Sequence, residues 1–158
     1  MPSRREQIVM SDEEVLGFLS EERTVACASN GPEGWPHVVP LWYVVRGPAS
    51  AATVWAWTFA KSRKVVNLES DPRATLQVEA GETYDQLRGV MLETEVVIHR
   101  DLEVVTALGL EIMARYAGGS VPEGAEEGVR RQAEKRVGLE FVERSRASWD
   151  HRKLGGTY

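Results

Sequence analysis

The sequence has 158 residues, one cysteine and a formal net charge of −5. This length predicts a single domain over residues 1–158, and a chain of this size folds around its own core without a disulfide or metal. The negative charge argues against nucleic-acid binding, and no apolar run approaches the roughly 18–20 residues of a transmembrane helix. We therefore expect neither nucleic acid nor a membrane as partner. The lone Cys27 and the absence of a signal-peptide pattern predict a cytoplasmic protein.

The first part of the chain predicts a helix and three strands. Ser11 is a good N-cap for a helix over residues 11–20, and Glu14 completes a capping box. Strands are expected at 24–28, 35–46 and 53–58, because β-branched and aromatic residues there alternate with turn signals at 30–34 and 47–50. Pro40 interrupts the second of these strands and indicates an edge, a bulge or a place where the strand opens toward a ligand.

The remaining chain alternates helices and strands. Helices are expected from Ser62 to Leu68, from Asp101 to the Gly118–Gly119 pair, and over 125–135; strands are expected at 74–80, 88–99 and 137–149. Six strands with mostly short connections predict an antiparallel sheet that closes into a barrel. The predicted fold is therefore mainly β with α, a six-stranded antiparallel barrel with flanking helices.

The segment from Trp57 to Lys64 carries the chemistry most typical of a binding site. The hydroxyls of Thr58 and Ser62 and the cations Lys61, Arg63 and Lys64 follow the end of a strand. A helix that begins near Ser62 directs its free N–H groups and positive dipole end to the same place, which favours phosphate binding. The alternative is a basic helix start that only faces solvent.

A second segment, Pro36 to Tyr43, combines a proline-containing strand with aromatic side chains. The freed backbone groups of such a strand are suited to the edge of a flat heterocycle. His37 is a candidate ligand or proton donor, or alternatively an ordinary hydrogen-bonded strand histidine, and Tyr43 is a second candidate proton donor. No catalytic triad or carboxylate pair stands out, and we predict no metal site.

These two motifs resemble a known family. The run Trp57-Thr58-x-x-x-Ser62-Arg63-Lys64 resembles the phosphate motif of the pyridoxamine-phosphate-oxidase-like, flavin-binding split-barrel superfamily. Its continuation to Ala74 is similar to the actinobacterial branch of flavin- and deazaflavin-dependent oxidoreductases, and residues 34–42 resemble the strand of that branch that lies against the cofactor ring. The resemblance runs from about residue 11 to 99 and continues more weakly to the C-terminus.

The resemblance implies a split barrel and a homodimer with cofactor sites at its interface. It also implies that a hydride is transferred between the cofactor ring and a small conjugated substrate. The cofactor it implies is FMN or the deazaflavin F420, with a slight lean to F420. Carried over by position, the residues at the cofactor phosphate are Thr58, Ser62, Arg63 and Lys64, with Trp57 beside them. The residues at the cofactor ring are Val39, Pro40, Leu41 and Trp42. Trp149 would reach the partner's cofactor, and an acidic cofactor tail would meet Lys61, Arg152 and Lys153.

Two departures from the family pattern bear on the substrate. Trp42 stands where pyridoxamine-phosphate oxidases have a basic residue, and Asp150-His151-Arg152 replaces their C-terminal Arg-x-His clamp. Pyridoxamine phosphate is therefore not the expected substrate. The alternative function is a non-catalytic flavin or haem carrier of the same fold, with His37 as the candidate axial ligand of a haem.

Overall fold

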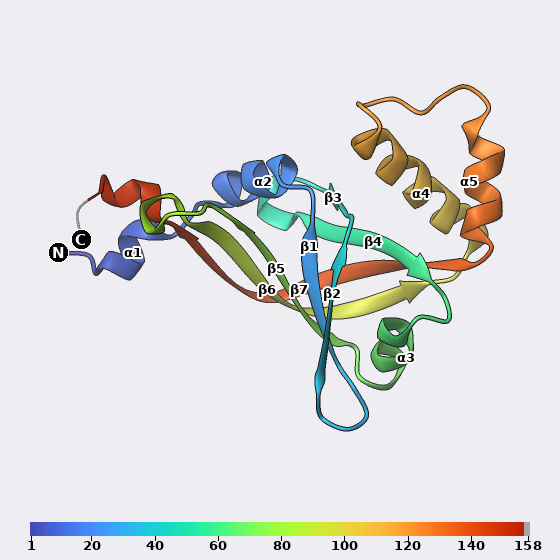
Figure 1. Cartoon of the computed structure of the whole chain (residues 1–158), viewed down its shortest axis with the longest axis horizontal. Coiled ribbons are helices and arrows are strands. Elements are labelled where there is room, and N and C mark those ends of the chain that lie inside the picture. The colour runs from blue at the N-terminus through green and yellow to red at the C-terminus, as the bar shows by residue number, and fades with distance from the viewer. Residues whose placement is uncertain (157–158) are drawn as a thin grey trace.

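The computed structural model describes residues 1–156 and is built on one curled antiparallel sheet. Its hydrogen-bonded order is β2-β1-β5-β6-β7-β4-β3, and the bounds are β1 (Val25–Asn30), β2 (Pro36–Leu41), β3 (Val44–Arg46), β4 (Thr53–Phe59), β5 (Arg73–Ala80), β6 (Arg88–His99) and β7 (Arg136–Asp150). β2 and β3 lie at opposite ends of this order, yet only residues 42 and 43 connect them. The sheet therefore has to curl until its two edges approach each other (Figure 1).

The prediction of one strand over 35–46 was wrong, because that segment forms two strands. Pro40 remains inside β2, opposite Ala26 of β1, and the break falls at Trp42 and Tyr43. The chain crosses there from one edge of the sheet to the other, and this crossing makes seven strands where six were expected. Pro40 is tolerated because β2 is an edge strand, which was one of the three interpretations of this proline.

Five helices accompany the sheet in the described chain: α1 (Arg4–Ile8), α2 (Asp12–Glu21), α3 (Arg63–Ser70), α4 (Leu102–Tyr116) and α5 (Ala125–Ala133). The capping box of Ser11 and Glu14 is present, and the side chain of Asp101 accepts a hydrogen bond from the Val104 N–H at 3.0 Å. α1 was not predicted, although Ser3 and Glu6 form a second capping box. None of the helices in residues 1–156 is both long and apolar enough to cross a membrane.

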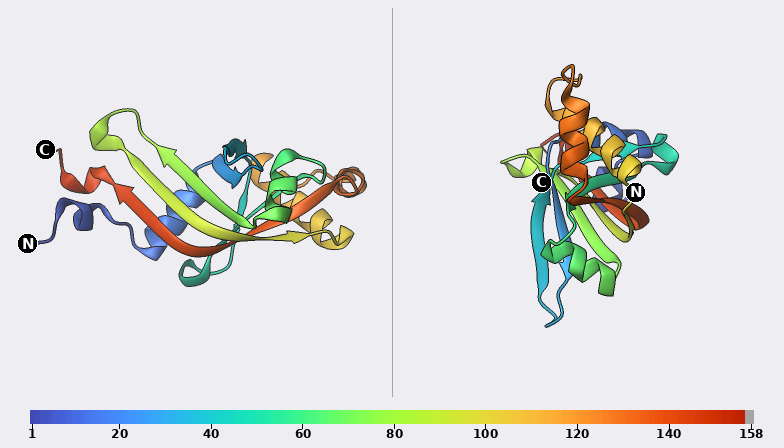
Figure 2. Two further views of the ribbon diagram at one scale, coloured as in Figure 1. Left: turned by 90° about the horizontal axis from the view of Figure 1, so that it is seen from below. Right: turned by 90° about the vertical axis from the view of Figure 1, so that its right-hand side faces the viewer.

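The core divides into two clusters on the two faces of β4. Inside the curl, α2 contributes Val15, Phe18 and Leu19 to the larger cluster. On the outer face, α4 packs Leu108 and Ile112 against Val44, with Trp55 and Trp57 at the margin. Figure 2 shows α4 and α5 at one end of the molecule and both chain termini together at the other. The neighbouring residues Trp57 and Thr58 consequently point to opposite faces of β4, Trp57 toward α4 and Thr58 into the curl.

Candidate functional site

The end of β4 and the start of α3 place a lysine at the mouth of the barrel. Thr58 lies on the inner face of β4, and its Oγ1 accepts a hydrogen bond from Lys64 Nζ at 2.9 Å. Lys64 is half-buried, and its burial lowers the pKa of the ammonium group below its usual value. Lys64 is thus held as a partly desolvated cation whose charge one hydroxyl satisfies only in part.

Ser62 occupies the N-cap position of α3, but its side chain forms no capping hydrogen bond. Its Oγ is buried and has no hydrogen-bond partner among residues 1–156. Lys61 and Arg63, on either side, are exposed, and the described chain contains no ion-pair partner for either of them. A free hydroxyl, two unpaired cations and the N-terminus of a helix together suit a phosphate group.

A hollow of about 480 Å³ lies between the β1–β2 turn and α3. It is lined by Gly31, Pro32, Glu33, Trp35, Pro36, His37, Arg63 and Asn67. Asn67 is only 3% exposed, and its Nδ2 donates to Ser29 Oγ at 3.1 Å, whereas its Oδ1 has no partner among the described residues. His37 Nδ1 is likewise buried without a partner there. Two residues that line the hollow therefore keep buried polar atoms without a hydrogen-bond partner among the described residues.

The residues predicted to lie against a cofactor ring follow β2 away from this hollow. Val39 and Leu41 are half-buried, Leu41 against the main core, and Pro40 is exposed on the other face. At the end of the strand, Trp42 is 58% exposed and stacks on Tyr116 with ring centroids 4.3 Å apart. The structure thus arranges His37, the ring-strand residues and Trp42 along one edge of the sheet.

Trp57 does not face the same way as Thr58. Its ring lies so close over Gly109 of α4 that no Cβ would fit there, and the Arg136 guanidinium lies 4.7 Å from the ring centroid. Because side chains alternate along a strand, Thr58 points inward while Trp57 points outward. Trp57 therefore supports α4, and the structure does not bring it into the cluster around Lys64.

The end of β7 and the short 3-10 helix that follows it (His151–Leu154) lie at the far end of the molecule from α3, and this segment contains Trp149 and the C-terminal cations (Figure 1). The Trp149 ring lies directly over Gly89, and Lys153 Nζ donates to Glu14 at 2.7 Å. Arg152 forms an ion pair with Asp150 at 2.7 Å. Within one chain these side chains do not reach the hollow beside α3, so they contribute to a cofactor site only if a second chain supplies them.

Tyr43, a candidate proton donor in the sequence, lies in the core and not beside the hollow. It is completely buried, and its hydroxyl donates to the Leu19 carbonyl oxygen at 2.5 Å. Burial raises the pKa of Tyr43 to about 12. Its distance from solvent and its bond to the end of α2 leave it no role toward a ligand.

Asn67 was missed at the sequence level, although the spacing contained a signal. Arg63 and Asn67 are four residues apart on α3 and therefore share one face of the helix. The residues opposite that face, in the turn from Gly31 to Trp35, could not be placed there without knowing that α3 packs beside β1.

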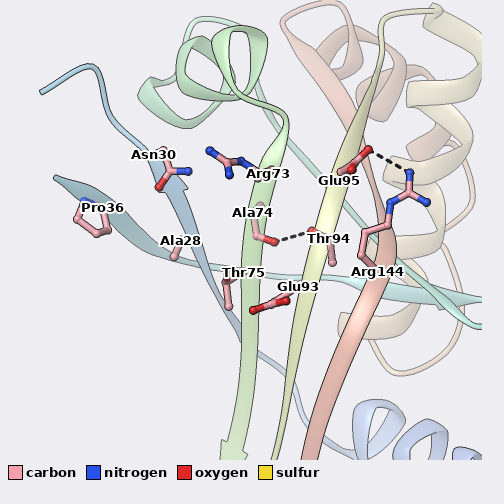
Figure 3. A pocket seen from close by; sticks show the side chains of 10 residues that line it. All are labelled: Ala28, Asn30, Pro36, Arg73, Ala74, Thr75, Glu93, Thr94, Glu95 and Arg144. Carbon is pink, nitrogen blue, oxygen red and sulfur yellow. Dashed lines mark hydrogen bonds and ion pairs between the residues drawn. The ribbon is translucent and has the colours of Figure 1, made fainter. Parts of the chain in front are cut away.

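A second hollow, of about 520 Å³, lies on the outer face of the sheet across β1, β5, β6 and β7 (Figure 3). Its charged side chains already have partners: Arg73 pairs with Asp71, Glu95 with Arg144, and Glu93 accepts from Ser145. Among residues 1–156, no group of three or more His, Cys, Asp or Glu side chains is arranged to hold a metal ion. The hollow beside α3 is therefore the better candidate for an anionic ligand.

Comparison with known proteins shows which family has this architecture. The family model of pyridoxamine 5'-phosphate oxidase matches residues 11–144, and therefore most of the chain, including α3 and β2. The chain belongs to this family. A search of functionally curated proteins gives no match.

Solved structures with a similar fold belong to proteins that are described in different ways. A conserved hypothetical protein of Mycobacterium tuberculosis, Rv2991, is 39% identical with a TM-score of 0.88, over 99% of this chain and 95% of its own. A protein described as an F420 reductase is 18% identical with a TM-score of 0.63, over 93% and 98%. The heme storage protein HutZ of Vibrio cholerae is 14% identical with a TM-score of 0.64, over 89% and 94%. The last two likenesses establish the fold alone.

Proposed function

We propose that the hollow between the β1–β2 turn and α3 binds the phosphate end of a flavin-type cofactor, F420 or FMN. The protein would then be an oxidoreductase that transfers a hydride between the cofactor ring and a small conjugated substrate other than pyridoxamine phosphate. The observation that carries this proposal lies at the start of α3, next to the hollow: the buried Ser62 Oγ and the exposed Arg63 have no partner among residues 1–156, and Lys64 is partly desolvated.

In this proposal each group of residues has a separate task. Arg63 and the free N–H groups of α3 attract the phosphate, and Ser62 and Lys64 donate hydrogen bonds to its oxygens. β2 positions the planar ring between His37 and Trp42. The bound cofactor supplies the hydride chemistry, and the protein supplies position, charge and exclusion of water.

Two features favour F420 over FMN. F420 carries acidic groups beyond its phosphate, and Lys61, which is exposed and has no ion-pair partner among residues 1–156, lies next to the proposed phosphate site. The fold likeness to a protein described as an F420 reductase agrees with this choice. Within one chain, Glu14 already neutralises Lys153, so Lys153 adds no free positive charge to this site.

We also propose that the protein is a homodimer. The end of β7 and the 3-10 helix after it, which contain Trp149 and Lys153, lie far from α3 of their own chain, so a second copy would be needed to bring them to a cofactor held there (Figure 1). The outer sheet face around Val38 (60% exposed) and Trp35 (78% exposed) offers apolar surface for such contact. Light scattering on purified protein should give twice the mass of the 17.6 kDa chain.

A carrier without turnover is the second candidate, and one observation favours it. His37 lines the hollow, and its Nδ1 has no hydrogen-bond partner among the described residues, so that nitrogen is not committed to another protein group. The absorption spectrum of the protein mixed with haemin distinguishes this case, because coordination by His37 would shift and sharpen the Soret band of haemin, and His37→Ala would abolish that change.

Fluorescence titration with F420 and FMN tests the main proposal. The double variant Arg63→Ala/Lys64→Ala should bind about 100-fold more weakly, since each charge-assisted hydrogen bond contributes roughly 1.5–3 kcal/mol and exposure of Arg63 reduces its share. The double variant Arg130→Ala/Arg131→Ala on α5 removes the same charge elsewhere and should bind as the parent does. Equal affinity of both variants would refute the phosphate site.

A further inference from the structure

The turn between β1 and β2 determines which backbone groups of β2 face away from the sheet. The Gly31 N–H donates to the Trp35 carbonyl at 3.1 Å, the Gly34 N–H donates to the Gly31 carbonyl at 3.2 Å, and Gly34 has a φ of +83°. This is a three-residue hairpin loop with glycine in the left-handed position, and Gly31 with Trp35 is its closing hydrogen-bonded pair.

Hydrogen-bonded and non-hydrogen-bonded pairs alternate along an antiparallel ladder. In the register of β1 and β2, His37, Val39 and Leu41 therefore direct their backbone groups toward β1. Pro36, Val38 and Pro40 direct theirs to the free edge. The parity agrees with the sequence, because a proline inside the ladder would remove a hydrogen bond to β1, whereas at these positions it removes none.

Val38 consequently provides the one outward N–H of β2, a strand that the structure describes in full. Pro36 and Pro40 offer only carbonyl groups, and β2 is the last strand in the sheet order. Figure 2 shows this strand on the outside of the sheet. Prolines on both sides of a single donor prevent another strand from adding to this edge. Val38 is therefore the residue of β2 that presents an N–H and a C=O side by side at this edge.

We propose that the backbone N–H and C=O of Val38 recognise the lactam edge of the cofactor ring. Flavins and deazaflavins share a pyrimidinedione ring in which an N–H lies next to a carbonyl. The Val38 N–H would donate to that carbonyl, and the Val38 C=O would accept from the ring N–H. This inference rests on the proposed function and names the part of the cofactor that β2 reads.

The distances along the strand are compatible with this assignment. Pro36 lines the hollow beside Arg63, and at 3.3–3.4 Å per residue Val38 lies about 7 Å further along the edge. A ligand with its phosphate at α3 would then have its ring beside Val38, between the hollow and Trp42 along β2. Haem has no lactam edge, so this contact distinguishes flavin-type rings from haem but does not distinguish F420 from FMN.

Substitution of Val38 by proline tests the inference, because it removes the outward N–H and little else. Pro36 and Pro40 already occupy equivalent positions, so Val38→Pro should keep the thermal unfolding temperature close to that of the parent. We expect Val38→Pro to bind both FMN and F420 about tenfold more weakly, whereas Val38→Ala, which keeps the N–H, should stay within about threefold.

A modified ligand gives an independent reading. 3-Methyl-FMN lacks the ring N–H, so the parent should bind it about tenfold more weakly than FMN, and this preference should be smaller in Val38→Pro. If that variant fails to fold, the amide resonance of Val38 in 15N-labelled parent protein should move downfield on titration with FMN.

The outcomes separate the two proposals. Equal binding of FMN and 3-methyl-FMN by the parent, or an unmoved Val38 amide on saturation, would overturn the role of Val38 and leave the phosphate site standing. A parent that binds neither FMN nor F420 would overturn the proposed function and this inference with it.

Discussion

The two ends of the barrel treat their buried polar groups in opposite ways. Where α2 ends, Arg115 of α4 donates to the carbonyl oxygens of Leu19 at 2.9 Å and Glu22 at 2.6 Å, and also to that of Tyr43. Where α3 begins, Ser62 Oγ, Asn67 Oδ1 and His37 Nδ1 have no partner among the described residues. Buried polar groups in folded proteins are almost always hydrogen-bonded, so the second end is the one that a ligand would complete.

This difference separates stability from binding. The α2–α4 end is assembled from side chains of three distant segments and should respond to substitution with a loss of folding free energy. The α3 end leaves polar groups free and should respond with a loss of ligand affinity. Each of the following substitutions tests one side of that division.

Arg115→Ala should have the largest effect on stability. The Arg115 guanidinium, together with the Tyr43 hydroxyl, satisfies the carbonyl groups at the end of α2, and it lies over the Tyr43 ring at 4.4 Å. Losing several charge-assisted hydrogen bonds from a partly buried site should lower the free energy of unfolding by about 3–4 kcal/mol. Urea unfolding followed by tryptophan fluorescence measures this loss.

Arg131→Ala is the matched control, because it removes an exposed arginine whose pairing with Glu127 spans one helical turn. It should change the free energy of unfolding by less than about 0.5 kcal/mol. If Arg115→Ala were as stable as this control, or if it weakened FMN and F420 binding while remaining folded, the separation of the two ends would not hold.

Local structure at both ends could be predicted from the sequence. The end at which the buried polar groups would all be hydrogen-bonded could not. Capping residues and turn signals located α2, α3 and the strand over 88–99 because these depend on neighbours in the chain. Strand alternation alone would also have separated Trp57 from Thr58. The pairing of Lys153 with Glu14 joins residues at opposite ends of the sequence, and the break at Trp42 and Tyr43 depends on the curl of the whole sheet. Neither leaves a local signal.

Alkaline pH should weaken the interior that lies between the two ends. Cys27 is 1% exposed, and burial raises the pKa of its thiol from 9.0 to about 11. The unfolded chain loses this proton first, so the free energy of unfolding should be unaffected by Cys27 below pH 9 and should fall by about 2–3 kcal/mol as the pH rises to 11.

Cys27→Ala isolates the contribution of the thiol. Its free energy of unfolding should start lower because a buried side chain is shortened, but it should decline less between pH 9 and 11 than that of the parent. Urea midpoints across this range measure both slopes, and parallel slopes would show that the thiol does not carry the dependence. Ionisation of Tyr43, whose pKa burial raises to about 12, adds to the decline from about pH 10 upward in the parent and the variant alike, so the difference between their slopes isolates the thiol.

Ser62→Ala should have the smallest effect and draws the sharpest contrast with Arg115→Ala. The Ser62 hydroxyl forms no capping bond and has no partner among residues 1–156, so its removal should leave the free energy of unfolding within about 0.5 kcal/mol of the parent or raise it. The same change should weaken FMN and F420 binding about fivefold, since it removes a donor to the phosphate. Ser11→Ala serves as the control, because Ser11 accepts from the Glu14 N–H at 3.2 Å and should cost about 1 kcal/mol of stability without altering affinity. A Ser62→Ala protein that lost stability and kept its affinity would assign this hydroxyl to the fold and would move the phosphate site away from the start of α3.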